Sequence, residues 1–284
     1  MARQLGRLLL SVSLAAIVTA SCGGGGGSSD GPGSTGRGAP AGQANRLPPG
    51  AVTLVALGDS LTAGDGDDSG QGYAGRLFEA IGAETGRADS TLVNLGASGW
   101  DSTMMVDGAD GEPSELARAL DEVRSAVDSG RGVLATVLIG SNDLWYVYEY
   151  GPPEGTPPES ENAAVDTYRR NLDRAVRELR DAGALVIVGL PDDQSLRTGV
   201  ADIGRLNELL PNVTAGEVDQ MAVLAKRLVD VAEQVADDHG ALVVDTNAPF
   251  WANQSKMADD GIHPNGAGYS DLAELWLAVI REVL

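Results

Sequence analysis

The chain has 284 residues, of which 41 are acidic and 20 are basic, so its formal net charge is −21. Hydrophobic residues make up 43% of the sequence, a share typical of a folded globular protein rather than of a disordered chain. DNA, RNA and anionic membrane surfaces would repel such an acidic body, which argues against nucleic-acid binding. We expect the charge to keep the protein soluble.

Cysteine and histidine are scarce in this sequence. Cys22 stands alone, and His239 and His263 are the two histidines. A single cysteine cannot form an intramolecular disulfide, and these three residues cannot complete the usual structural zinc ligand sets. We therefore expect no metal and no other cofactor.

The first 21 residues have the pattern of a secretory signal peptide. Basic residues precede an apolar run over residues 8–20, which is too short to span a membrane as an ordinary helix. Cys22 then follows small residues, as in the bacterial lipoprotein signals that this segment resembles, in which the cysteine is acylated after cleavage. Simple secretion with an incidental Cys22 is the alternative. In either case we expect export, and acylation would anchor the protein to a bacterial membrane in the cell envelope.

Residues 22–50 are rich in glycine, serine and proline and have almost no apolar side chains to bury. This composition predicts a flexible tether. Residues 51–284 show no repeat and no second boundary, so we expect them to form a single, monomeric domain.

The domain alternates short β-branched apolar runs with longer segments of helical period, which predicts a parallel sheet covered on both faces. Helical stripes are centred on residues 116–127, 165–179 and 218–235, and a closing helix is expected over residues 264–284. We expect an α/β fold, a three-layer α/β/α sandwich of flavodoxin-like type with a mainly parallel five-stranded sheet. Its strands are predicted at Val52–Leu57, Thr91–Leu95, Val133–Ile139, Leu185–Leu190 and Leu242–Val244.

The first predicted strand runs directly into Gly58-Asp59-Ser60. The glycine permits a tight turn at the carboxyl edge of the sheet, where ligands bind in such folds. This motif alone leaves two interpretations open. Ser60 is a catalytic nucleophile, or Asp59 and Ser60 cap the helix that follows.

Two further polar loops that contain glycine follow predicted strands, at residues 94–99 and 140–143. Because the carboxyl ends of parallel strands share one edge of a sheet, these loops should lie near Ser60. Their small residues would let backbone N–H groups approach a ligand closely.

Near the C-terminus, Asp260 precedes His263 by three residues, just ahead of the closing helix. This spacing lets the carboxylate accept a hydrogen bond from the imidazole and fix its tautomer. His239 lies at the predicted end of a long helix, beside a glycine, which favours a helix-end role. Asp259 could also supply a carboxylate to the imidazole, but we expect its side chain to be solvated.

These four blocks, in this order, resemble the GDSL/SGNH hydrolase family, and the resemblance extends over essentially the whole domain. It implies a serine esterase or lipase with Ser60 as nucleophile, His263 as general base and then acid, and Asp260 as the residue that orients the imidazole. It also implies an oxyanion hole made by the N–H groups of Ser60 and Gly96 and the side-chain amide of Asn142.

The chemistry of these residue types agrees with the resemblance. A serine hydroxyl becomes a good nucleophile once a positioned base takes its proton, and donors must stabilise the oxyanion that forms. We therefore expect hydrolysis of a carboxylic ester, namely an acyl lipid, a small ester or an O-acetylated glycan, through a seryl acyl-enzyme. Acyl transfer to another alcohol and a catalytically silent envelope-binding lipoprotein are the alternatives.

An aromatic cluster follows the third block. It either walls the substrate cleft or packs in the core. The cluster comprises Trp145, Tyr146, Tyr148 and Tyr150.

Overall fold

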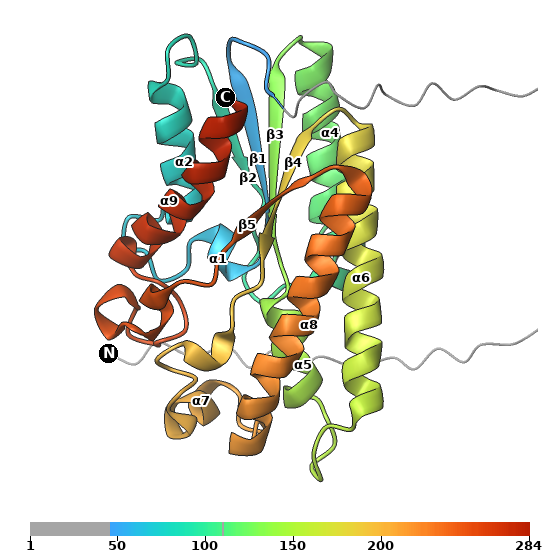
Figure 1. Cartoon of the computed structure of the whole chain (residues 1–284), viewed down its shortest axis with the longest axis vertical. Coiled ribbons are helices and arrows are strands. Elements are labelled where there is room, and N and C mark those ends of the chain that lie inside the picture. Colours follow the sequence, from blue (N-terminus) through green and yellow to red (C-terminus); the bar gives the residue numbers. More distant parts are fainter. Residues whose placement is uncertain (1–45, 110) are drawn as a thin grey trace, which may run out of the picture. The chain divides into compact units, whose positions relative to one another are not determined.

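The computed structural model describes residues 46–109 and 111–284 (Figure 1). The predicted signal peptide at residues 1–21, the predicted acylation site Cys22 and most of the predicted tether at residues 22–50 lie outside this part. Within the described part, no helix has both the length and the apolar character that crossing a membrane requires.

Five strands form one parallel sheet in the order β2-β1-β3-β4-β5. Each strand begins and ends within one residue of its predicted range, which confirms the predicted sheet. The strands are β1 (Val52–Gly58), β2 (Thr91–Asn94), β3 (Gly132–Leu138), β4 (Leu185–Leu190) and β5 (Leu242–Asp245).

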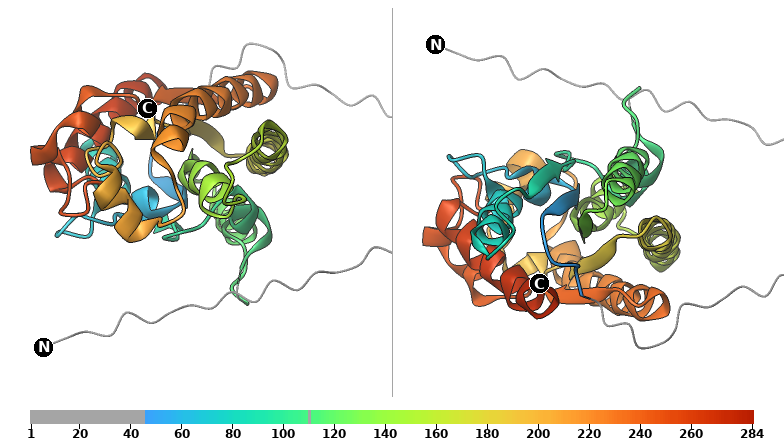
Figure 2. Two further views of the ribbon diagram at one scale, coloured as in Figure 1. Left: turned by 90° about the horizontal axis from the view of Figure 1, so that it is seen from below. Right: turned by 90° about the horizontal axis from the view of Figure 1, so that it is seen from above.

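Helices cover both faces of the sheet, as the views along and across it show (Figure 1, Figure 2). One face is covered by α2 (Gly72–Ala83) and α9 (Gly266–Val283). The other is covered by α4 (Glu115–Asp128), α6 (Pro158–Asp181) and α8 (Ala215–His239). This confirms the predicted three-layer α/β/α sandwich.

Shorter elements complete the described chain. The α-helical ones are α1 (Ser60–Ala63), α3 (Ser102–Asp107), α5 (Ser141–Glu149) and α7 (Ile203–Leu209). The 3₁₀ turns are η1 (Gln194–Leu196), η2 (Pro249–Ala252) and η3 (Gln254–Lys256). In Figure 1, α5 and α7 lie beyond the carboxyl ends of the strands that precede them.

The core explains why the central strands are continuously apolar. All seven residues of β1 and all seven of β3 are buried, and successive side chains point into opposite layers. Val55 contributes to the layer under α4, α6 and α8, whereas Leu54 contributes to the layer under α2 and α9. In the second layer, Tyr73 of α2 stacks on Trp276 of α9 with ring centroids 5.2 Å apart.

The ends of α8 follow local sequence rules. Thr214 and Glu217 form a reciprocal capping box at its start, and Gly240 ends it in the left-handed conformation with φ of 62°. His239, the last residue of α8, places Nε2 2.7 Å from Oδ1 of Asp173 on α6. This agrees with the predicted helix-end position of His239.

The sheet order places a switch point between β1 and β3. The chain leaves β1 toward β2 on one side, and β3 lies on the other side of β1. In flavodoxin-like folds the ligand crevice opens at the carboxyl ends of these two strands. The residues after β1 and β3 therefore flank this crevice.

A substitution at Gly58 tests how closely β1 and β3 approach each other. Its φ is +148°, and a Cβ there would lie 2.0 Å from the carbonyl oxygen of Leu138. Gly58→Ala is expected to lower the free energy of unfolding by at least about 2 kcal/mol, because the strained backbone alone costs about 1–3 kcal/mol and the clash adds to it. Urea denaturation measures the change.

Gly82→Ala in α2 is the control, since a Cβ there meets no atom within 4 Å. It is expected to stabilise the protein by about 0.5–1 kcal/mol. Equal effects of the two substitutions would contradict the tight contact at Gly58.

Candidate active site

Ser60 lies at the turn from β1 into α1. Asp59 is the N-cap of α1, and its Oδ1 accepts a hydrogen bond from the backbone N–H of Leu61 at 3.0 Å. Ser60 is thus the first residue of the helix, and it is half-buried whereas Asp59 is fully buried. The capping interpretation therefore applies to Asp59, and the Ser60 hydroxyl is left for another partner.

That partner is His263. The Nε2 atom of His263 lies 2.9 Å from Oγ of Ser60, and its Nδ1 atom lies 2.6 Å from Oδ2 of Asp260. With the proton on Nδ1, where the carboxylate accepts it, Nε2 has its lone pair directed at the serine hydroxyl. The structure thus brings together the three residues that the sequence nominates as a triad.

Asp260 is held in its charged form by several donors. Its Oδ1 accepts the backbone N–H groups of Ile262 at 2.8 Å and of His263 at 2.9 Å. Burial opposes ionisation, but the hydrogen bonds from the His263 ring and from these two amides outweigh it and lower the pKa of Asp260 to about 2. Asp259 is exposed, as expected for a solvated neighbour.

Close backbone packing fixes the loop that carries Asp260 and His263. Gly199 donates its N–H to the carbonyl of Gly261 at 2.7 Å. A Cβ on Gly261, whose φ is +68°, would lie 2.6 Å from the Gly199 nitrogen. Gly66 packs against the other side, where a Cβ would lie 2.9 Å from Cβ of His263. Glycine contacts therefore hold the backbone on both flanks of the segment that carries Asp260 and His263.

A buried ion pair also supports this loop. Arg197 is 1% exposed and donates to both carboxylate oxygens of Asp192, at 2.9 and 2.6 Å. It also donates to the carbonyl of Ile262 at 3.3 Å, and its guanidinium lies 4.6 Å from the ring centroid of Trp251. Asp192 is close to Arg197 in the sequence, but Ile262 is 65 residues away, so the support that Arg197 gives to this loop could not be read from local sequence.

Three oxyanion donors are expected. The N–H of Ser60 lies at the start of α1. Gly96 lies on the loop after β2 and Asn142 is the second residue of α5, and these two already have protein acceptors. The N–H of Gly96 donates to Oδ1 of Asn94 at 3.1 Å, and Nδ2 of Asn142 donates to the carbonyl of Trp100 at 2.8 Å. Asn142 keeps a second amide hydrogen. Gly96 would have to share or release its bond to Asn94 before it could serve an oxyanion.

Gly96 packs directly on the helix that begins with Ser60. A Cβ at Gly96 would lie 2.5 Å from the nitrogen of Ala63, so a larger residue would push the loop away from α1. The loop after β2 is also tied to α5, since Tyr146 donates its hydroxyl to the carbonyl of Gly99 at 2.7 Å. The two loops therefore hold each other in place around the turn at Ser60.

Some residues of the aromatic cluster pack in the core, and others lie nearer the surface. Trp145 and Tyr148 are buried in the core, at 4% and 1% exposure. Tyr146 lies at the boundary and makes the bond to Gly99, whereas Tyr150 is 74% exposed. Tyr146 and Tyr150 contact each other with ring centroids 5.3 Å apart.

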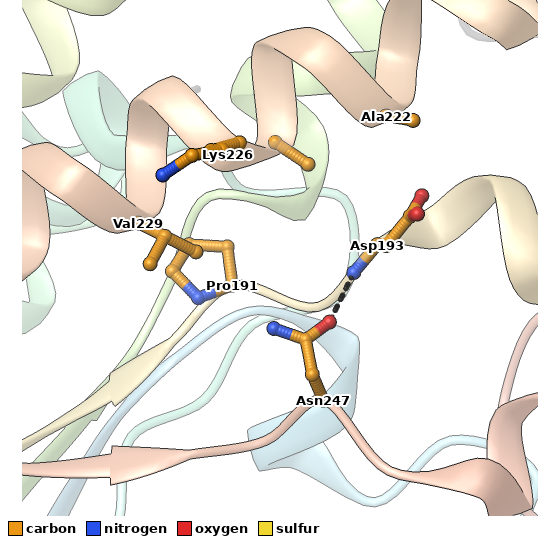
Figure 3. Close-up of a pocket in the computed structure, with 7 residues that line it drawn as sticks. Pro191, Asp193, Ala222, Lys226, Val229 and Asn247 are labelled. Atoms are coloured by element: carbon orange, nitrogen blue, oxygen red, sulfur yellow. Dashed lines mark hydrogen bonds between the residues drawn. The ribbon is translucent and has the colours of Figure 1, made fainter.

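Two pockets open near the carboxyl edge. One, of about 530 Å³, is lined by Asp260 together with Asp67, Asp68 and Asp259, so its walls are acidic. The other, of about 370 Å³, lies against α8 and the loops after β4 and β5, where Asp193 donates its N–H to Asn247 (Figure 3). Among the described residues, no group of three or more His, Cys, Asp or Glu side chains could hold a metal ion.

Three carboxyl groups adjoin the site, of which Asp59 and Glu115 are buried and Asp143 is partly buried. Burial raises the pKa of Asp59 to about 6, that of Asp143 to about 7 and that of Glu115 to about 9. Unfolded carboxyl groups lose their protons near pH 4, so the folded state binds more protons than the unfolded state from about pH 4 to about pH 9.

The free energy of unfolding is therefore expected to fall as the pH rises through this range, with urea denaturation at about pH 5, 7 and 9 as the measurement. Glu115→Gln, which cannot ionise, should flatten the decline above about pH 7. A wild-type stability that stays constant or rises from pH 5 to pH 9 would be inconsistent with protonated carboxyl groups here.

Several known proteins are similar to this chain in sequence or in structure. The protein YpmR of Bacillus subtilis (strain 168) is 26% identical over 241 residues, which cover 82% of this chain and 83% of YpmR. An acetyl xylan esterase from Geobacillus stearothermophilus has a similar structure, with a TM-score of 0.53 and 22% identity over 82% of this chain and 96% of that chain. A phospholipase A1 from Streptomyces albidoflavus NA297 gives a TM-score of 0.50 and 21% identity over 82% of this chain and 99% of that chain.

The two structural likenesses show the fold. A model of the GDSL-like Lipase/Acylhydrolase family matches residues 56–270, a span that contains Ser60, Asp260 and His263. The match covers most of the chain, and this protein therefore belongs to the GDSL-like lipase/acylhydrolase family.

Proposed function

We propose that this protein is a serine hydrolase that cleaves carboxylic esters through a covalent acyl-enzyme. The observation that carries the proposal is the unbroken series of contacts from Oγ of Ser60 through the His263 ring to the Asp260 carboxylate. Membership of a family described by lipases and acylhydrolases supports the same reaction class.

The proposed reaction has two steps. Ser60 Oγ attacks the ester carbonyl carbon while Nε2 of His263 takes the hydroxyl proton, and the alcohol leaves with that proton. Water then attacks the acyl-enzyme with His263 again as base, which releases the acid and restores the serine. Asp260, ionised and fixed by three donors, stabilises the imidazolium that forms in each step.

The tetrahedral oxyanion needs donors that are already in place. The N–H of Ser60, the N–H of Gly96 and the second amide hydrogen of Asn142 are the donors we assign to it. Each such donor contributes on the order of 3 kcal/mol to transition-state stabilisation. Substrate entry would have to draw the Gly96 N–H away from Asn94.

We propose an uncharged ester as the substrate, since the acidic pocket beside Asp260 repels anions. A neutral acyl lipid, a small neutral ester and an O-acetylated neutral glycan satisfy this condition. Among the similar structures, one is an acetyl xylan esterase and another a phospholipase A1.

The purified protein is expected to release p-nitrophenol from acyl esters and to be labelled at Ser60 by a fluorophosphonate. Ser60→Ala should lose both properties and stay folded.

Rates on acetyl, butyryl and long-chain esters and on acetylated sugars would identify the acyl group. Absence of both ester cleavage and labelling would favour a silent binding protein. With glycerol or a sugar added as acceptor, formation of the acylated acceptor would favour a transferase.

We further propose that residues 1–21 direct export and that Cys22 is acylated, which would tether the domain to a bacterial membrane. The support is the order of the basic, apolar and small residues before Cys22 and the composition of the segment after it. Radiolabelled palmitate is expected to be incorporated by the wild type in a bacterial host and not by Cys22→Ala. Label that persists in the variant would rule out the anchor.

A further inference from the structure

The peptide groups at Gly58 link the nucleophile turn to the loop that carries Gly96. The N–H of Gly58 donates to Oε2 of Glu115 at 2.7 Å, and its carbonyl accepts the N–H of Ala97 at 3.0 Å. Asp59 and Ser60 follow Gly58 directly, and Ala97 follows Gly96. A shift of Gly58 would therefore move the nucleophile and an oxyanion donor together.

Glu115 reaches this point from a different element. It is the first residue of α4, after the N-cap Ser114, and it is completely buried. Its Oε2 atom binds Gly58, whereas its Oε1 atom has no hydrogen-bond partner within the described residues. A carboxyl group with one unpaired oxygen costs stability in the core, so packing alone does not explain it.

The surroundings of Glu115 set how it binds Gly58. Burial raises its pKa to about 9, the bond from Gly58 works in the opposite direction, and nearby Asp59 raises it further. At neutral pH the side chain is therefore a carboxylic acid that offers a neutral carbonyl-type oxygen to the Gly58 N–H. A glutamine side chain offers the same kind of acceptor at the same reach.

We propose that Glu115 is a positioning residue that sets Ser60 and the Gly96 loop in register with His263 by holding the Gly58 N–H. The proposal rests on the proposed ester hydrolysis. Without the acceptor, the Gly58 amide would be buried and unpaired, and the strand end would move to find another partner. Acyl transfer is sensitive to such movement, since a misplacement of about 1 Å can cost about 100-fold in rate.

Kinetics of the full-length protein on p-nitrophenyl acetate test the proposal through three variants. Glu115→Leu is expected to lower kcat by roughly 100-fold with KM nearly unchanged, because the loss concerns the geometry of reaction and not the binding of ester. Glu115→Gln is expected to keep most of the wild-type kcat. Glu217→Leu is the matched control, because Glu217 is also a buried carboxyl that accepts backbone amides, those of Thr156 and Thr214.

Glu217→Leu should lower the thermal stability and leave kcat unchanged, which separates positioning from general destabilisation. If Glu115→Leu does not fold, Glu115→Asp takes its place. Its shorter side chain withdraws the acceptor from Gly58, and a fall in kcat would again support the proposal.

A folded Glu115→Leu or Glu115→Asp protein with wild-type kcat would overturn the proposal, as would a Glu115→Gln protein as impaired as Glu115→Leu. Failure of the proposed function gives a different result. In that case the wild type itself would neither hydrolyse the ester nor be labelled at Ser60.

Discussion

The close approach of β1 to β3 at Gly58 is the constraint on which the site depends. A Cβ atom at Gly58 would lie only 2.0 Å from the carbonyl oxygen of Leu138, so no side chain fits there. Because the strands meet so closely at their carboxyl ends, the segments that follow them open the same crevice. Ser60 follows one strand and Asn142 follows the other, so the nucleophile and an amide donor reach one place without a long loop.

The imidazole reaches this crevice from the far end of the chain, 203 residues after Ser60. The segment that carries it is held by contacts that leave no room for a side chain, at Gly66 beside His263 and Pro264 and between Gly199 and Gly261. Arg197 adds a bond to the Ile262 carbonyl from within a buried ion pair. Removal of one partner from a buried ion pair is strongly destabilising, so this contact adds to the stability of the loop before His263.

Local patterns in the sequence predict the sheet and the pairing of Asp260 with His263, whereas the nucleophile role of Ser60 rests on the resemblance of the four blocks to the family, because its motif alone also fits a helix cap. Continuous apolar runs mark strands buried on both faces, and the short spacing from Asp260 to His263 places a carboxylate against an imidazole. Glu115 escapes prediction because its partner Gly58 is 57 residues away. Arg197 has Asp192 five residues before it, but the carbonyl of Ile262, which it also bonds, is 65 residues away. The bond from Gly96 to Asn94 is different, because an Asn two residues before a glycine is a recognisable local turn pattern.

The aromatic residues of helix α5 also show what the sequence alone could not predict. Its aromatic residues suggest a cleft wall or a core, and the fold divides them between the two, with Tyr148 buried and Tyr150 exposed.

Two carboxyl groups near the site differ in protonation state at neutral pH, so they have different roles. Asp260, with three donors, has its pKa lowered to about 2, whereas Glu115, with one donor and complete burial, has its pKa raised to about 9. Burial acts against the charge in both cases. It outweighs the single donor at the fully buried Glu115, whereas the donors to the partly exposed Asp260 outweigh it there. An imidazolium at His263 therefore has a fixed negative charge against it at Asp260. Behind the nucleophile, the protonated Glu115 holds a backbone amide without adding its own charge to that of Asp59.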